Sequence, residues 1–184
     1  LKITVTGTRS ERSVEDIPAS IEVFDLEDLR EKGSTDLKSI TRYEPGVSVV
    51  DPRTNNYGGA ASTGNLNIRG MSNNRVLSLQ DNIRLPQGFY GVGYDYSNAN
   101  TVDYFTLKTI DILKGPASSL YGSDALGGVV SFNTLTVDDI LEEGETIKYE
   151  FPAKLNSANS SLSGAARVAY RDEENGFSYL AVLS

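Results

Sequence analysis

The stretch Ile110-Asp-Ile-Leu-Lys-Gly-Pro-Ala-Ser-Ser-Leu-Tyr-Gly122, followed by Ala125-Leu-Gly-Gly-Val-Val-Ser-Phe132, decides the fold of the first part of this chain. Residues 107–113 predict a strand, which stops at Lys114-Gly115-Pro116 because proline has no amide to give to a sheet. Residues 117–121 predict a helical turn, and Gly127-Gly128 leads into another strand. A strand, a turn of helix and a second strand in so short a span predict a compact mixed module.

The residues before this stretch predict more short elements of both kinds. Asp25 is a helix N-cap candidate before Leu26 and Leu29. A second helix, capped by Ser34 or Thr35, carries Leu37, Ile40 and Tyr43 on one face and ends at Glu44-Pro45-Gly46. Strands are predicted over 2–7, 17–24, 47–50 and 65–70, and over 76–80 and 83–85 around an Asp81-Asn82 turn. Residues 52–64 and 86–101 predict long polar loops, which in a compact domain are functional or disordered. The first 134 residues are thus expected to form an α+β module.

Composition excludes several classes of function. The chain has 184 residues, no Cys and no His, which excludes disulfides, a thiolate or His metal site and a Ser-His-Asp triad within it. Its net charge of −8 would repel a phosphate backbone, so nucleic acid is not an expected partner. No apolar run is long enough for a transmembrane helix, and no signal peptide is visible at Leu1, so we expect a mature chain or an internal piece.

The last fifty residues follow a different pattern. Residues 137–145 hold five acids and no base, and 138–141 predict one helical turn. Apolar and polar residues then alternate over 147–151, 162–171 and 177–183, with a turn at residues 172–176. Strands of about ten residues with one apolar face are typical of transmembrane barrels. An ordinary antiparallel sheet with one wet face would show the same alternation, so the pattern alone leaves both open.

Several blocks resemble, in order, the plug domain of TonB-dependent outer-membrane receptors. They are Ile3-Thr-Val-Thr-Gly-Thr-Arg9, Ile17-Pro-Ala-Ser-Ile-Glu-Val-Phe24, Asn65-Leu-Asn-Ile-Arg-Gly70, Asn74-Arg-Val-Leu77 with Asp81, and the two stretches quoted first. The blocks cover residues 1–134, and the Asn74 block with Thr136-Val-Asp138 looks most like the haem-receptor branch. The resemblance implies an N-terminal extension (1–16), a small mixed-sheet plug (17–134), an acidic plug–barrel linker (135–145) and the first strands of an incomplete antiparallel β-barrel (146–184).

The family's function is gated uptake of a scarce nutrient. In such receptors the plug fills a barrel of about 22 strands, and TonB pulls on an N-terminal box so that cargo passes. The resemblance therefore implies a receptor plug for haem or a ferric siderophore, with no catalysis and no cofactor of its own. Its implied partners are the TonB C-terminal domain, the chain's own barrel and an extracellular iron complex. The implied localisation is the outer membrane of a Gram-negative-type bacterium, with the plug inside the barrel and its N-terminus facing the periplasm.

The resemblance also suggests site residues. Ile3, Thr4, Val5, Thr6 and Gly7 form a candidate TonB box, since an extended segment can add a strand to a partner sheet; a frayed first strand of the plug is the alternative. Arg69 and Lys114 match basic residues that lock the plug to barrel carboxylates, although Lys114 stands where the family usually has Arg and lacks its bidentate fork. An ordinary surface base is the alternative for each.

Five aromatic residues in the two long loops are candidate ligand contacts. Flat amphipathic rings suit a macrocycle or an aromatic chelate, although they would equally suit packing against a barrel wall. They are Tyr57, Phe89, Tyr90, Tyr94 and Tyr96. Because the chain has no His, haem ligation by the plug would need a Tyr, a barrel His or another chelate. The rival functions are a stand-alone binding or signalling module on the plug fold, a plug for another nutrient such as cobalamin, and, without motif support, a carboxylate enzyme.

Overall fold

The computed structural model describes residues 3–4, 12–13, 19–26, 28, 37–49, 66–90, 94–97, 102–156, 160–173 and 175–184. They belong to two compact units, which we describe separately. Unit 1 comprises Leu1–Val102 and Thr109–Asn133, and unit 2 comprises Asp103–Lys108 and Thr134–Ser184. In the described part of the chain, no helix has both the length and the apolar character needed to cross a membrane.

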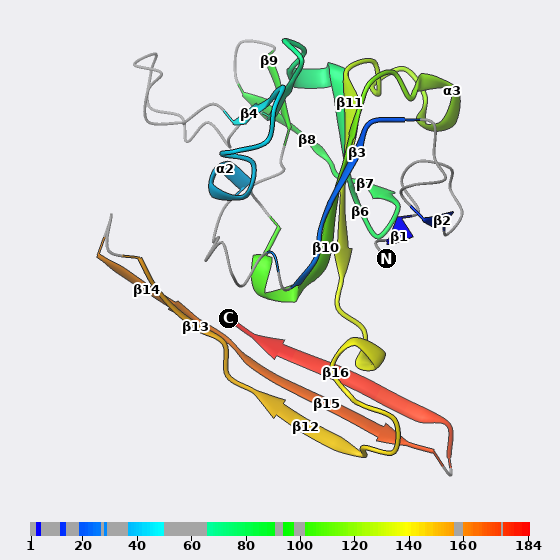
Figure 1. Ribbon diagram of the computed structural model, residues 1–184, viewed down its shortest axis with the longest axis vertical. Helices are drawn as coiled ribbons and strands as arrows, with labels where there is room; N and C mark the ends of the chain where they lie inside the picture. Colours follow the sequence, from blue (N-terminus) through cyan, green and yellow to red (C-terminus); the bar gives the residue numbers. More distant parts are fainter. Residues whose placement is uncertain are drawn as a thin grey trace. The chain divides into compact units, whose positions relative to one another are not determined.

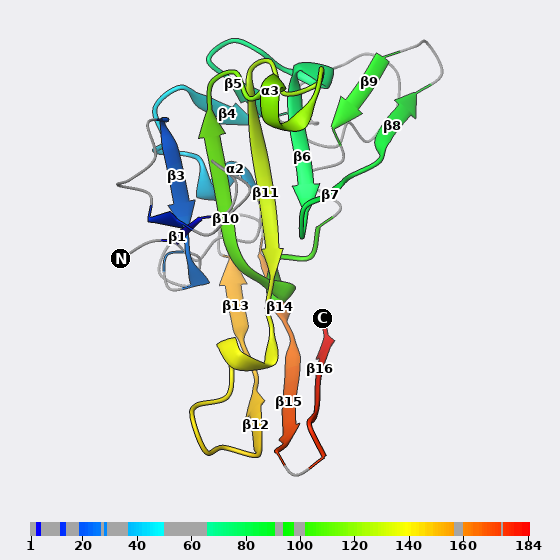
Figure 2. The same cartoon turned by 90° about the vertical axis from the view of Figure 1, so that its right-hand side faces the viewer.

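Unit 1 is built on a five-stranded mixed sheet. Its strands, in spatial order, are β3 (Ile21–Phe24), β10 (Leu107–Lys114), β11 (Gly128–Thr134), β6 (Val76–Gln80) and β7 (Ile83–Arg84). β3 runs antiparallel to β10, β6 runs parallel to β11, and β7 runs antiparallel to β6. Figure 2 shows β3, β10, β11 and β6 side by side in this order. Together with two short helices, this mixed sheet confirms the expected α+β class.

Both faces of this sheet are covered. Alternation along β10 directs Leu113 to one face and Ile112 to the other. Leu113 belongs to a core cluster that includes the helix α3 (Ser118–Tyr121). The cluster consists of Ile21, Val23, Leu77, Leu79, Leu113, Ala117, Tyr121, Ala125 and Val129. Ile112 is fully buried as well. Since burying a large aliphatic side chain contributes about 1.5–3 kcal/mol, these contacts fix the position of the strand that the opening stretch predicts.

The local sequence signals for helix starts and turns are mostly correct. Asp25 and Asp28 cap each other: the Asp28 amide donates to Asp25 Oδ1 at 2.9 Å, and the Asp25 amide donates to Asp28 Oδ2 at 3.2 Å. Asp81 and Asn82 have φ values of 48° and 65°, as a two-residue type I′ hairpin turn requires. The helix α2 (Leu37–Ile40) buries Leu37 and Ile40.

Tyr43 does not follow the predicted helical face. Its side chain is 81% exposed, because α2 ends at Ile40 and residues 41–43 form a turn. The Arg42 guanidinium carbon lies 5.7 Å from the centre of the Tyr43 ring, so the ring packs under a cation at the surface. The Ser34 and Thr35 cap predictions lie outside the described residues.

The described residues of unit 1 also form three two-stranded ladders. They are β1 (Ile3–Thr4) with β2 (Arg12–Ser13), β4 (Val47–Val49) with β5 (Leu66–Ile68), and β8 (Gln87–Tyr90) with β9 (Tyr94–Ser97). The prediction of a loop over 86–101 is therefore wrong for eight of its residues. Aromatic residues favour strands, and this preference outweighs the glycines that suggested a loop. The β9 strand lies against β6 and the 3₁₀ turn η3 (Asn73–Arg75).

Unit 2 contains the three-stranded antiparallel sheet β12-β15-β16. The strands are β12 (Ile147–Glu150), β15 (Ala166–Asp172) and β16 (Phe177–Leu183), shown side by side in Figure 1. β13 (Ala153–Asn156) pairs with β14 (Ser161–Gly164) in a separate ladder. Single 3₁₀ turns, η5 (Tyr104–Thr106) and η6 (Val137–Asp139), belong to this unit too. The strand expected over 162–171 is therefore divided at Ala165, between β14 and β15.

The two faces of the unit 2 sheet differ in exposure. Ile147, Tyr149, Phe177, Tyr179 and Leu183 are all at least 46% exposed, so the apolar side chains of the alternation remain uncovered. The opposite face carries Ala169, which is fully buried against Ile140 and Leu141. The helical turn predicted near residue 138 is confirmed as η6, and it covers the face that the alternation marks as polar.

Candidate functional site

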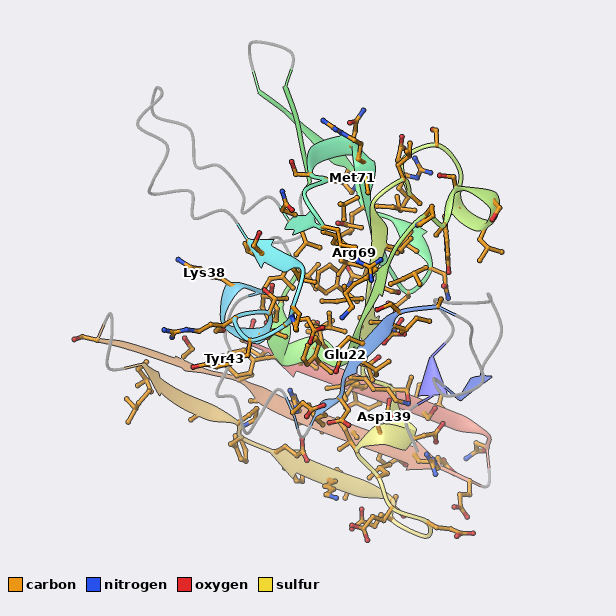
Figure 3. All side chains as sticks on the ribbon, turned by 45° about the horizontal axis from the view of Figure 1, so that its top comes forward. Glu22, Lys38, Tyr43, Arg69, Met71 and Asp139 are labelled. Carbon is orange, nitrogen blue, oxygen red and sulfur yellow. The ribbon has the colours of Figure 1, made fainter. Side chains whose placement is uncertain are left out.

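Arg69 lies in a tight turn that joins β5 to Met71. The amides and carbonyls of Ile68 and Met71 bond each other at 2.8 and 3.0 Å, and the two residues between them have φ values of 51° and 85°. These are the signs of a type I′ turn, which favours Asn or Gly rather than Arg at its first central position. Figure 3 labels Arg69 and Met71 in this turn.

The position of the Arg69 side chain is defined by two glycines. Its backbone amide donates to the Gly46 carbonyl at 2.7 Å. A Cβ placed on Gly46 would lie 3.4 Å from Arg69 Cγ, and one placed on Gly115 would lie 3.9 Å from Nη1. The side chain therefore extends past Gly46 toward the residue that follows Lys114. Arg69 is exposed, and no carboxylate of the described residues forms an ion pair with it.

Lys114 ends β10, and its ammonium forms an ion pair with Glu44 in unit 1. The Lys114 and Glu44 side chains are 10% and 12% exposed, so the pair is largely removed from water. The Lys114 amide donates to the Ser20 carbonyl at 2.8 Å, which fixes the end of β10. The sequence did not single out Glu44, because 70 residues separate it from Lys114. Its place before Pro45-Gly46 was identified only as a helix end.

These charged residues lie at one end of the β4–β5 ladder. Val47 pairs with Ile68, and Val49 pairs with Leu66, so the ladder is three residues long. Glu44 and Arg69 flank the end at Val47, whereas the predicted loop 52–64 with Tyr57 joins the strands at the other end. That loop lies outside the described residues, and its role in ligand contact stays a prediction.

The candidate TonB box is described in part. Ile3 and Thr4 are extended and pair with Ser13 and Arg12, respectively, in an antiparallel ladder. Val5, Thr6 and Gly7 lie outside the described residues. Among the described residues β1 pairs with β2 alone, and a strand has a second edge at which another ladder can form.

Four of the five candidate aromatic residues lie on one hairpin. Phe89 and Tyr90 belong to β8, and Tyr94 and Tyr96 belong to β9. Phe89 is opposite Asp95, and Tyr90 is opposite Tyr94. The backbone of β8 and β9 thus gathers these residues within a few positions of one another, on a regular element instead of a loop.

In unit 2, Arg167 is a buried cation that the alternation placed on a wet face. Its side chain is 3% exposed. Nε donates to the Phe105 carbonyl at 2.9 Å, Nη2 donates to the same oxygen, and Nη1 donates to Glu150 Oε2 at 3.1 Å. One signal in the sequence could have indicated its burial. Ala165 and Ala169, two residues away on either side, are small and apolar, although the alternation assigns them to the same polar face.

Acidic residues of the segment 135–145 form ion pairs with basic residues of unit 2. Asp139 accepts bonds from the Thr136 amide and hydroxyl at 2.8 and 2.7 Å and lies 2.5 Å from Lys108 Nζ. Partial burial opposes its ionisation, but the bonds from Lys108 and Thr136 outweigh this, so the pKa of Asp139 lies below its ordinary value. Asp138 pairs with Arg171. Figure 3 labels Asp139 in η6.

The described residues of unit 1 offer cations and a hairpin that carries aromatic residues. Within the described ranges, no group of three or more acidic side chains gathers closely enough to hold a metal ion. What unit 1 presents is an exposed guanidinium beside a buried ion pair, and a hairpin of aromatic residues. Such groups can bind a carboxylate and a flat ligand, respectively.

Several known proteins are similar to this chain. The chain is 33% identical over 156 residues to the transferrin-binding protein A of Haemophilus influenzae, covering 80% of this chain and 16% of that protein. It is 29% identical over 175 residues to the hemin receptor of Yersinia enterocolitica, covering 95% of this chain and 24% of that protein. The chain thus spans a quarter or less of the length of these relatives.

A solved structure shows the same fold. The FpvA protein of P. aeruginosa, bound to a pyoverdine–iron complex, matches 98% of this chain and 22% of its own with a TM-score of 0.68 and 20% identity. The family model described as the TonB-dependent receptor plug domain matches residues 13–129, more than half of the chain. This chain therefore belongs to the plug-domain family of TonB-dependent receptors.

Proposed function

We propose that the chain is the plug, with the first wall strands, of an outer-membrane receptor that takes up an iron complex with energy from TonB. The observation that carries the proposal is a plug-family sequence continuing into an antiparallel sheet with two unlike faces. One face is apolar and exposed, and the other is charged and covered. Strands that cross a membrane as part of a closed wall need this division, because lipid lies on one side and polar contents on the other.

In this proposal the plug gates a pore and catalyses no reaction. The candidate box, Ile3 to Gly7, would add a strand to TonB from the periplasmic side. Arg69 would hold the plug closed by binding a carboxylate of the wall. The guanidinium suits that task, because it presents paired donors in a planar fork that matches a carboxylate. The chain would need no cofactor, since the iron complex is its cargo.

We further propose that the cargo is a haem or a ferric siderophore. The support is the hairpin β8–β9, whose register places Tyr90, Tyr94 and Tyr96 on one side of the ladder and Phe89 on the other. Aromatic rings offer apolar faces to a flat chelate, and tyrosine hydroxyls can bond its polar rim. Because the chain has no His, its own contribution to haem recognition would be stacking and tyrosine contacts.

Uptake of labelled iron tests this function. The full-length receptor would be expressed in a Gram-negative host that lacks its own haem and siderophore receptors. We expect uptake of one of the two cargo classes in cells with TonB, and uptake at background in cells without it. Equal uptake with and without TonB would refute the receptor function.

A matched pair of variants tests the box. Val5→Pro removes a backbone hydrogen-bond donor and fixes φ, so strand addition should fail. Val5→Ala keeps the backbone donor and the freedom of φ, so strand addition should persist. We expect surface binding of cargo to be unchanged in both variants and uptake to be lost in Val5→Pro. Normal uptake by Val5→Pro would place the box elsewhere.

A further inference from the structure

We propose that Glu44 holds Lys114 in an ion pair within unit 1, which we call the clasp. Of the two predicted lock cations, Arg69 alone then binds a carboxylate outside this unit. The inference rests on the gating function proposed above and changes which cation performs it. Glu44 becomes a positioning residue, which neutralises Lys114 and leaves Arg69 as the outward contact.

The first argument is the burial of the pair. Both side chains are about one-tenth exposed, and a buried charge must be paired. Lys114 carries a compact ammonium, which a single carboxylate neutralises, and Glu44 supplies that carboxylate from the turn after α2. A second carboxylate arriving from outside would have to displace Glu44, leaving a buried anion without its partner.

The second argument is the different state of Arg69. Its side chain is exposed, and none of the described residues pairs with it. It also holds a φ of 51° at a turn position that Asn or Gly would occupy with less strain. Strain of this kind is characteristic of sites where the side chain has a task.

The third argument is the charge at this corner. Arg69 Nη1 lies 3.9 Å from where a Cβ of Gly115 would stand, directly after Lys114 in the chain. Both cations therefore lie near the same end of β10, and two unpaired cations in one region repel each other. Because Glu44 cancels the charge of Lys114, one net positive charge remains, on the group with the planar fork.

A double-mutant cycle on the 184-residue chain tests the clasp. Glu44→Gln and Lys114→Met should each raise the unfolding equilibrium constant about 100-fold. The double variant should show about the same 100-fold change, rather than the product of the two. As the matched control, Arg69→Met combined with Glu44→Gln should give the product of their separate effects within about threefold. Independent effects of Glu44 and Lys114 would overturn the proposal.

A measurement on the unaltered chain does not depend on the folding of any variant. Brief treatment with an amine-reactive ester, followed by peptide mass spectrometry, compares Lys114 with the exposed Lys38 of α2. We expect Lys114 to react at least about tenfold more slowly, because its ammonium is buried and paired. Equal reaction rates would overturn the clasp.

Antibiotic permeability of cells with the full-length receptor tests the outward role. A loosened plug admits large antibiotics, so Arg69→Gln should sensitise cells to vancomycin severalfold, whereas Glu44→Gln with Lys114→Gln should not. Sensitivity of the Glu44 and Lys114 double variant equal to that of Arg69→Gln would overturn the proposal. If Arg69→Gln has no effect while the cycle shows coupling, the gating role fails and the clasp stands.

Discussion

Replacing Arg167 with Met should release η5 from the sheet of unit 2. In the native chain two guanidinium nitrogens donate to the Phe105 carbonyl and a third donates to Glu150. Methionine keeps most of the apolar stem but none of the donors. The carbonyl oxygen of Phe105 would then be left without its cation, in the place where the guanidinium is now buried.

The expected loss follows from these contacts. A hydrogen bond from a charged group contributes about 1.5–3 kcal/mol net. We assign most of this free energy to the bonds with the Phe105 carbonyl. The bond with Glu150 contributes less, because Glu150 is 23% exposed and regains contact with water when the bond is lost. A total of about 3 kcal/mol results, which corresponds to about a 100-fold change in a local opening equilibrium.

Hydrogen exchange at the Leu135 amide measures this opening. That amide donates to the Thr106 carbonyl at 2.8 Å, next to Phe105, so it should exchange about 100-fold faster in Arg167→Met. The Lys114 amide, bonded to Ser20 in unit 1, is the internal reference. Arg171→Met is the control, since its partner Asp138 is 83% exposed and the pair contributes at most about 1 kcal/mol. Acceleration of less than about threefold in Arg167→Met would refute the reasoning.

Three further predictions concern single positions. In Gly128→Ala the new Cβ would lie 2.3 Å from the Leu113 carbonyl oxygen, so calorimetry should show a melting temperature lower by about 5–10 °C. The control Gly164→Ala should change the melting temperature little, because the atom nearest to its new Cβ would be 3.4 Å away. The lowered pKa of Asp139 stabilises the fold at pH values above the ordinary value of 3.8, and this contribution is lost as the pH falls through the lower folded value. Thermal melts should therefore show an advantage of the native chain over Asp139→Asn at pH 7, and this advantage should shrink progressively as the pH is lowered below 3.8. Arg69→Gly should raise the melting temperature by about 2–5 °C by relieving a positive φ, while Arg69→Ala should not; a rise of equal size in both would contradict the strain argument.

Local signals in the sequence predicted the elements whose geometry is set by neighbouring residues. Asp25 caps a helix start, Asp81-Asn82 forms the two-residue turn, and the strand after Leu107 ends at Lys114. The failures have the same local origin. Glycines suggested a loop over 86–101, but strand pairing depends on a partner that a local window does not contain.

The candidate site was less predictable, because its contacts join distant segments. The Glu44–Lys114 pair spans 70 residues, and Arg167 reaches a carbonyl 62 residues away. The alternation correctly assigned Arg167 to the polar face of its strand. It could not show that η5 and η6 cover that face, since burial depends on the tertiary arrangement.

The positive φ values of the chain separate structural turns from a functional one. Among the described residues, four non-glycine residues have positive φ: Arg69, Asp81, Asn82 and Ser160. Asp and Asn tolerate this region because their short side chains bond the nearby backbone, so the turn at 81–82 needs no further explanation. Arg69 has no such local compensation, and its strain costs on the order of 1 kcal/mol or more. Arg69 has a positive φ that its residue type disfavours, and its side chain is exposed. A partner beyond unit 1 explains this conformation better than the stability of its own turn does.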